Sequence, residues 1–321
     1  MKQDHLYLRK LFSKPFHATK AGGQTNRNYI VVCKGKKFFA RLPWEGVVDR
    51  NVEGTNIARL AQNQKLKAIL PRFFLYILQK KNILDQKDKR IFSVPDGTMV
   101  SEYLAGKEFN IARFQEKKYQ QALARMFYAF HTSGVRFVNP YDVFRDEIKK
   151  YRIGAVKYQL RRFLDGNTTD QLKKIERVAR EKLPSLKRGI STHNDFLFQN
   201  FLVGKDKKIY LLDFEYAGLN KKGGIFYDFG FLLADNLFRK PPVTRELFEE
   251  FLTVADRVYK RRLDRKQIYW SAVAALLVQI WWGILRHFRV SFRERPYFKE
   301  YVQKRVEGIM ELYDGIKRKE S

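Results

Sequence analysis

The stretch that most constrains this chain lies at residues 191–218 and reads STHNDFLFQNFLVGKDKKIYLLDFEYAG. In it, Asn200 follows Asp195 by five positions, and a second acidic residue, Asp213, comes directly after an apolar run. The polar turn at residues 203–208 is short enough for a β-hairpin, so we expect the hairpin to bring both carboxylates to one wall of a cleft. A carboxylate for the acceptor, an amide and a carboxylate for the metal, in this order, are the parts of a phosphoryl-transfer site.

The residue types indicate a role for each position. Asp195 would orient the acceptor hydroxyl, while Asn200 and Asp213 would hold Mg²⁺ through oxygen atoms, the ligands that this hard cation prefers. His193, two positions before Asp195, would brace the loop rather than transfer protons. The alternative for this stretch is a plain turn in which Asp195 caps a helix.

Composition limits the classes of protein to which the chain can belong. Its 321 residues, 45% of them hydrophobic, can bury the core of one large domain or of two lobes. The single cysteine, Cys33, excludes an intramolecular disulfide and a cysteine-based zinc site, and it fits a reducing compartment. Residues 1–12 carry charges throughout and lack the apolar run of a signal peptide. We therefore predict a cytoplasmic protein.

The net charge of +30 admits nucleic acid or an anionic membrane surface as a partner. However, the basic residues are scattered along the chain, and no motif typical of nucleic-acid binding accompanies them. We therefore expect a solvated basic surface, no specific nucleic-acid partner, and at most a weak contact with an anionic membrane surface.

The segments ahead of the central stretch alternate between short β-rich runs and turns. Gly22 and Gly23 open a loop that continues with Thr25 and Asn26. Glycine has no side chain in the way, so its backbone N–H groups can approach phosphate oxygens. We predict that these four residues bind nucleotide, although an ordinary hairpin is as compatible with the glycine pair alone.

A basic residue and an acidic residue follow this loop in the order of a kinase-like lobe. Arg41 lies on the third predicted strand, and Glu53, twelve residues later, opens a polar helix predicted at residues 53–65. In such a lobe the strand cation contacts phosphates and pairs with an acidic residue of the next helix. The alternative is a surface arginine and a glutamate that interacts with the helix dipole.

The β-rich part of the chain ends at residues 99–104, which we predict to form an edge strand that passes into a linker. In a two-lobed kinase this segment is the hinge, so we expect the backbone around Glu102 and Leu104 to contact adenine. Helical spacing of apolar residues dominates the rest of the chain. The predicted fold is therefore α+β and bilobal, protein-kinase-like, with a small β-sheet N-lobe (1–103) and a larger, mostly helical C-lobe (104–321).

Two acidic residues stand out beyond the central stretch. Asp228 directly precedes an apolar helix predicted at residues 229–238, where it would cap the N-terminus. Asp235 lies inside this helix, where a charge needs a partner or a cleft. A second apolar stretch, residues 270–285, is shorter than the about 20 residues that a membrane span needs and contains a glutamine, so we predict a buried helix there.

At these residues the chain resembles the choline/ethanolamine kinase family, within the larger group of aminoglycoside-phosphotransferase-like kinases, and most closely the bacterial choline kinases. The segments that carry the resemblance are GGQTNRNY (22–29), FFARLPW (38–44), HNDFLFQN (193–200) and LLDFEYAG (211–218). Position by position, the resemblance implies that Asp195 is the catalytic base, that Asn200 and Asp213 bind the metal, and that Glu215 lies beside it. It likewise implies a phosphate-contacting ion pair of Arg41 with Glu53.

The resemblance also implies a pocket for a cationic acceptor. Asp235 falls where choline kinases have an acidic residue that lines this pocket, and Trp282 begins their W-G-x-W motif. Aromatic faces and a carboxylate attract a cation that cannot donate hydrogen bonds. Two departures are Leu285, in place of the second tryptophan, and the additional Trp281. Because adjacent helical residues face different ways, one of the two neighbouring tryptophans is expected in the core.

Together these features predict a kinase that uses ATP and Mg²⁺ to phosphorylate the hydroxyl of a small cationic amino alcohol. Choline is the first choice of acceptor, ethanolamine the second, and Asp195, Glu215, Asp235, Trp281 and Trp282 would surround it. One alternative is a related kinase for thiamine, an aminoglycoside or a sugar. Another is a non-catalytic, basic binding protein with the kinase fold, against which the intact Asp195, Asn200 and Asp213 argue.

Overall fold

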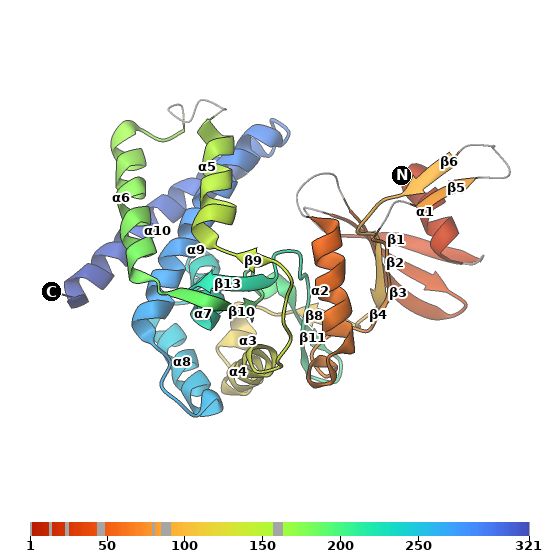
Figure 1. Ribbon diagram of the computed structural model, residues 1–321, viewed down its shortest axis with the longest axis horizontal. Helices are drawn as coiled ribbons and strands as arrows, with labels where there is room; N and C mark the ends of the chain where they lie inside the picture. The colour runs from red at the N-terminus through yellow and green to blue at the C-terminus, as the bar shows by residue number, and fades with distance from the viewer. Residues whose placement is uncertain are drawn as a thin grey trace. The chain divides into compact units, whose positions relative to one another are not determined.

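The structure of the chain is a computed structural model, shown in Figure 1. It describes residues 2–12, 15–22, 26–43, 49–78, 81–84, 91–156 and 163–320. The chain forms two compact units. The first, here called the sheet unit, comprises Met1–Glu108, Ser133–Val138 and Phe201–Tyr216. The second, the helical unit, comprises Phe109–Thr132, Asn139–Asn200 and Ala217–Ser321.

The sheet unit is built on a five-stranded antiparallel sheet of order β1-β2-β3-β7-β4. Its strands are β1 (Phe16–Ala21), β2 (Asn26–Cys33), β3 (Lys36–Pro43), β4 (Phe73–Tyr76) and β7 (Met99–Glu102). The helix α1 (Lys2–Leu11) precedes the sheet, and its residues Tyr7 and Leu8 join Val31, Ala40 and Val100 in one buried cluster. A separate hairpin pairs β5 (Lys81–Leu84) with β6 (Ile91–Val94).

The position of β7 differs from the sequence-based prediction of an edge strand. It lies inside the sheet, between β3 and β4, because Phe38–Arg41 pair with one side of it and Phe73–Tyr76 with the other. Residues Met99, Val100 and Ser101 are accordingly buried. The sequence does not show this pairing, since the partner strand on each side is distant along the chain.

The helix α2 (Arg50–Gln62) begins three residues before the predicted start at Glu53. Asp49 caps it: the side chain accepts the backbone N–H groups of Asn51 and Val52 at 3.0 and 3.2 Å. Glu53 therefore lies in the first turn, where its carboxylate also benefits from the helix dipole.

The predicted hairpin of the central stretch is present in the sheet unit. Strand β11 (Phe201–Gly204) pairs with β12 (Ile209–Leu211), and the other edge of β11 pairs with β8 (Gly106–Glu108). This small sheet extends the sheet unit beyond the predicted boundary at residue 103. Gly106 is required at the contact, because a Cβ atom there would lie 2.4 Å from the carbonyl oxygen of Val203.

The helical unit is the larger of the two and carries most of the helices (Figure 1). Its helices are α3 (Ile111–Phe114), α4 (Lys117–His131), the π-helical turn η2 (Val143–Ile148), α5 (Lys149–Val156), α6 (Gly166–Lys182), the 3-10 turn η4 (Phe198–Asn200), α7 (Ile225–Asn236), α8 (Arg245–Tyr259), α9 (Arg265–Arg289) and α10 (Arg295–Glu320). A three-stranded sheet of order β10-β13-β9 joins β10 (Ser185–Thr192), β13 (Gly218–Lys222) and β9 (Pro140–Tyr141).

The helix α9 is the centre of this unit, with α7 and α10 as its main neighbours. By length and composition it is one helix able to cross a membrane, but 94% of its most apolar window is buried inside the protein. The prediction of a buried helix is thus confirmed. Gly230 of α7 allows the close approach, because a Cβ atom there would lie 2.5 Å from the backbone nitrogen of Ala272.

Candidate active site

The loop that carries the predicted catalytic carboxylate follows β10 in the helical unit. The structure brings Asp195 and Asn200 together: the amide Nδ2 of Asn200 donates to the backbone carbonyl of Asp195 at 2.8 Å and to its Oδ2 at 3.0 Å. The amide oxygen of Asn200, which a metal ion would use, takes no part in these two bonds. The five-residue spacing thus closes a compact loop that orients the carboxylate.

The buried carboxylate of Asp228 on α7 holds the backbone of this loop. Asp228 accepts the backbone N–H groups of Asn194 and His193 at 2.8 and 3.1 Å, and its Oδ2 lies 2.8 Å from Nε2 of His131. Asn194 has a φ of 65°, a left-handed backbone conformation that side-chain-bearing residues adopt at a cost. The predicted capping role of Asp228 is wrong, because α7 begins at Ile225 and Asp228 already lies within its first turn.

His193 is completely buried and packs its ring against Phe130 and Phe196, at centroid distances of 6.4 and 4.9 Å. This environment fits the predicted bracing role, which stays a prediction. Behind the loop, His131 bridges two elements, since Nδ1 lies 2.6 Å from the hydroxyl of Tyr259 while Nε2 faces Asp228.

The predicted ion pair of the sheet unit is formed. Nη2 of Arg41 lies 2.6 Å from Oε1 of Glu53, and both side chains are at least 95% buried. Oε2 of Glu53 accepts from Arg50 at 2.7 Å and from the hydroxyl of Tyr76 at 2.6 Å. Burial alone would raise the pKa of Glu53, but the positive charges of Arg41 and Arg50 outweigh it and hold the pKa below its usual value.

Asp213 and Glu215 stand next to this pair in the sheet unit. Nη1 of Arg41 is 4.0 Å from Oδ1 of Asp213, and Nη1 of Arg50 is 3.8 Å from Oε2 of Glu215. Asn26, a predicted nucleotide-binding residue, donates to the same Glu215 oxygen at 3.4 Å. Burial raises the pKa of Asp213, and burial together with the neighbouring Asp213 charge raises that of Glu215 to about 7.

The chemistry of these oxygen donors fits a Mg²⁺ ion. Oδ1 of Asp213 is buried and has no hydrogen-bond partner among the described residues. A divalent cation beside Asp213 and Glu215 would stabilise the charged form of both carboxylates, which burial disfavours. Across those same residues no three His, Cys, Asp or Glu side chains gather as a metal group. In proteins Mg²⁺ is commonly held by one or two carboxylates plus substrate phosphates and water.

Asp213 shares a backbone feature with Asn194 of the catalytic loop. Its φ is 60°, again in the left-handed region, at the point where the chain leaves β12. Sparsely populated backbone conformations of this kind cluster at functional sites. Asparagine and aspartate are among the residues with side chains that adopt this conformation most readily, so the residue types at both positions suit it.

The other residues predicted to bind the nucleotide differ in their surroundings. The carbonyl of Gly22 accepts from Nδ2 of Asn28 at 2.9 Å, and a Cβ atom at Gly22 would meet nothing within 4 Å. Gly23 and Thr25 lie outside the described residues. Glu102 ends β7 and pairs with Arg72 at 3.3 Å, and Leu104 follows it before β8. Their contact with adenine stays a prediction.

On the predicted acceptor side, the structure places two arginines at Asp235. Arg239 lies 3.0 Å from Oδ2, and Arg305 of α10 lies 3.6 Å from Oδ1. Arg305 is buried, donates to Gln279 of α9 at 2.6 Å, and stacks on the ring of Tyr301, 3.4 Å from its centroid. The charge inside the apolar helix α7 thus has partners, as expected, and they are cations of this chain.

The two neighbouring tryptophans separate as expected. Trp281 is completely buried in the core, so a role in contact with the acceptor falls to Trp282, which is half-buried. The ring of Trp282 meets Tyr301 and Phe298 edge to face, each at 5.7 Å, and Arg286 at 5.9 Å. These contacts do not test the predictions that Asp235 and Trp282 bind the acceptor.

Leu285 explains one departure from the W-G-x-W motif. It is buried against α5, where a Cβ atom at Gly154 would lie 3.2 Å from its Cδ1. A tryptophan at this position would need space that the contact with α5 does not leave.

Several residues of the site were missed by sequence reasoning. Arg50 precedes Glu53 by three positions, a helical spacing that could have revealed it. Tyr76, Tyr301 and Arg305 have no such local signal, because they reach their partners from other elements.

Comparisons with known proteins were made against families, curated proteins and solved structures. The family description "Choline/ethanolamine kinase" matches residues 22–243. The search of curated proteins returns no match.

Solved structures that resemble the chain share its fold at low identity. A choline/ethanolamine kinase family protein from Mesorhizobium loti is 19% identical, with a TM-score of 0.68, covering 97% of this chain and 95% of that one. The choline kinase LicA from Streptococcus pneumoniae is 20% identical, with a TM-score of 0.67 and coverage of 97% and 98%. A microcompartment-associated aminopropanol kinase is 15% identical, with a TM-score of 0.71 and 98% of each chain covered. These likenesses confirm the predicted α+β, protein-kinase-like fold.

Proposed function

Because the chain belongs to the choline/ethanolamine kinase family, we propose that it transfers the γ-phosphoryl group of ATP, with Mg²⁺, to the hydroxyl of a small alcohol. The family makes it a small-molecule kinase, and ATP, Mg²⁺ and the acceptor are the proposed parts. Choline and ethanolamine are the acceptors that the family favours. The kinases similar in structure include one for aminopropanol, which is also an amino alcohol.

The observation that carries the proposal is the paired arrangement of Asp195 with Asn200. Nδ2 of Asn200 holds the Asp195 carboxylate at 3.0 Å, and Asp228 fixes the backbone on the preceding side. A carboxylate held in this way can accept a hydrogen bond from the acceptor hydroxyl and take its proton as the new O–P bond forms.

The sheet unit supplies charge for the nucleotide. Arg41, fixed by Glu53 at 2.6 Å, would contact the α- and β-phosphates. Asp213 and Glu215, with the amide oxygen of Asn200, would hold Mg²⁺, which neutralises the phosphate charge when bound. The LicA kinase has also been solved in complex with AMP, which supports a nucleotide as the donor here.

Replacement of Asp195 by alanine tests the proposal. We expect Asp195→Ala to lower kcat at least about 10³-fold for every acceptor, because no other group takes the hydroxyl proton, and to leave ATP affinity within about threefold. The measurements are ATP consumption with choline, ethanolamine, thiamine, aminoglycosides and sugars, and nucleotide binding by calorimetry. The matched control is Asp170→Asn, at a carboxylate that is 76% exposed on α6. Normal turnover by Asp195→Ala would contradict the site assignment.

A further inference from the structure

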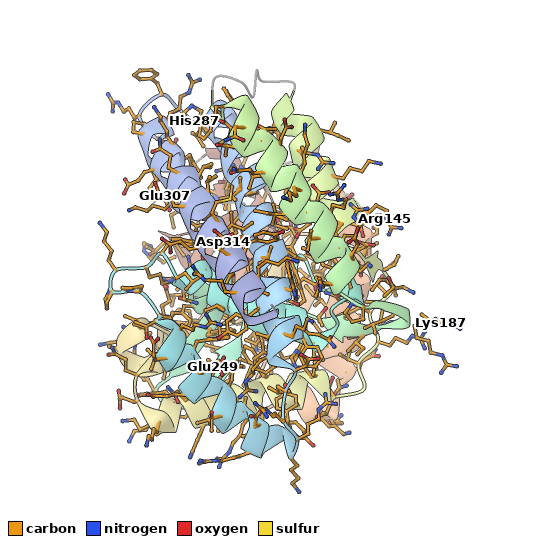
Figure 2. The ribbon with its side chains drawn as sticks, turned by 90° about the vertical axis from the view of Figure 1, so that its left-hand side faces the viewer. Arg145, Lys187, Glu249, His287, Glu307 and Asp314 are labelled. Atoms are coloured by element: carbon orange, nitrogen blue, oxygen red, sulfur yellow. The ribbon has the colours of Figure 1, made fainter. Side chains whose placement is uncertain are left out.

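The acceptor side of the helical unit contains its own cation. Arg305 comes from α10, whose outer face shows Glu307 and Asp314 in Figure 2, while Arg305 itself is 5% exposed. Its guanidinium contacts Oδ1 of Asp235 at 3.6 Å, the side-chain oxygen of Gln279 at 2.6 Å, and the ring of Tyr301. A carboxylate and an aromatic face are the two features that bind a quaternary ammonium, and Arg305 occupies both.

This cluster belongs to the same region as the catalytic loop. Arg239, the second arginine at Asp235, also donates to the side chain of Gln199, the residue before Asn200. Burial raises the pKa of Tyr301, Arg305 opposes this, and the negative charges of Asp235 and Asp195 raise it further. Trp282 meets the ring of Tyr301 at 5.7 Å. Of the predicted acceptor residues, Asp235 therefore contacts Arg305, and Trp282 contacts the tyrosine ring on which Arg305 stacks.

The charge of the cluster follows directly. The carboxylate of Asp235 is paired with two arginines, Arg239 and Arg305, so it does not present the unmatched negative charge that would favour a cation. Close approach of α10 makes this possible, since a Cβ atom at Gly283 would lie 2.8 Å from Tyr301 and from Val302. The sequence-based prediction of a cation pocket named acidic and aromatic residues and neither of the two arginines.

We propose that Arg305 is a built-in cation which takes the place of the substrate ammonium between Asp235 and Tyr301, so that the acceptor alcohol carries no quaternary ammonium group. The acceptor class is then an alcohol whose other end is uncharged or bears oxygen atoms that accept hydrogen bonds. Arg239, with 28% of its side chain exposed, supplies N–H donors for such oxygens. The inference rests on the proposed function and makes Arg305 the residue that determines acceptor specificity.

Choline and its uncharged isostere 3,3-dimethylbutan-1-ol provide the test, because they share a shape and differ in charge. Binding of each to the full chain is measured by calorimetry or ligand-observed NMR in wild type and in Arg305→Gln. We expect wild type to bind choline no more than about threefold more tightly than the isostere. Arg305→Gln should raise choline affinity about tenfold, because Asp235 and the Tyr301 ring become available, with isostere affinity unchanged.

The matched control is Lys304→Gln, which removes one positive charge from the neighbouring, more exposed position of α10 and should leave the ratio unchanged. A second variant, Asp235→Asn, keeps the test open if Arg305→Gln fails to fold. Because Arg239 and Arg305 already pair with Asp235 in the wild type, Asp235→Asn should change the affinities for choline and for the isostere by the same factor.

A wild type that prefers choline by tenfold or more would overturn the proposal, and so would binding of neither probe to either protein. Because binding does not require turnover, the proposed kinase activity and the proposed role of Arg305 can fail independently. If no alcohol is phosphorylated while the predicted binding ratios hold, the kinase assignment is wrong and the role of Arg305 stands.

Discussion

The side chain of Asp228 accepts several of the hydrogen bonds that hold the catalytic loop in place. Its two oxygens accept from the backbone of His193, the backbone of Asn194 and the ring of His131, and the residue is completely buried. A buried carboxylate with several donors is stabilised as an anion. The same bonds hold Asn194 in its left-handed conformation, and thereby the direction of Asp195.

We expect Asp228→Asn to lower kcat about 10²-fold, because an amide has one accepting oxygen and cannot hold both backbone groups, so Asp195 shifts. Affinity for ATP should change by less than about threefold, since the nucleotide residues belong to the sheet unit. Steady-state kinetics with titration of ATP measure this. As a control, Asp256→Asn also removes a carboxylate that accepts a backbone N–H, that of Leu263, but outside the loop. Equal kcat values for Asp228→Asn and wild type would contradict the positioning role.

At the residue scale, the sequence predicted what depends on spacing and missed what depends on packing. Asp195 and Asn200 meet because five positions of one loop separate them, and that number is visible in the chain. Asp235 and Arg305 meet because α7 and α10 pack on the same helix, which no local pattern records. The charge of Asp235 within an apolar helix indicated that this residue has a partner but did not identify the partner.

Among the elements, the helix pair α7 and α9 depends on one small residue. Gly230 leaves room for the backbone of α9, and a Cβ atom there would lie 2.5 Å from the nitrogen of Ala272 and from Cβ of Ser271. These are backbone or near-backbone atoms, so a flexible side chain cannot move aside. Asp228 and Asp235 flank this contact on α7, and their positions follow from it.

Replacement of Gly230 by alanine should destabilise the protein by about 2 kcal/mol, because the added methyl group forces α7 away from α9. The comparison is Gly166→Ala in the first turn of α6, where a Cβ atom meets nothing within 4 Å. This change should be neutral or slightly stabilising. Urea denaturation of both variants gives the free energies of unfolding. Equal effects of the two changes would show that the contact with α9 does not constrain the position of α7.

Element types were predicted better than their pairing. The hairpin β11–β12 and the buried helix α9 follow from a short turn and a continuous apolar run. The inner position of β7 and the pairing of β10 with β13 involve partners distant in sequence, and neither leaves a local signature.

For the whole molecule, stability should depend on pH through a buried carboxylate of the helical unit. Glu147 of η2 is 6% exposed and accepts from the hydroxyl of Tyr141 at 2.5 Å. Burial raises its pKa to about 7, while the hydrogen bonds from Tyr141 and Tyr151 and the charge of Lys150 oppose the rise. The folded protein therefore holds a proton that the unfolded chain releases near pH 4.5.

The sign of the effect follows from this difference. The stabilising contribution of Glu147 is complete below about pH 4.5 and is lost as the pH rises through about 7. Glu147→Gln keeps a neutral side chain, so we expect it to exceed wild type by about 3 kcal/mol at pH 8 and to match it at pH 4.5. Urea denaturation across this range measures the difference. The exposed Glu181→Gln is the control, and parallel curves for Glu147→Gln and wild type would contradict the prediction.

The burial of α9 has a consequence for biosynthesis. Its 25 residues leave the ribosome before α10, one of the helices that pack against it, has emerged. During that interval the chain presents an apolar segment that meets the length and hydropathy of a membrane span. The competition between folding and membrane insertion is therefore decided by how soon α10 emerges and packs, and slow emergence of α10 would favour capture of the nascent chain by chaperones or the membrane.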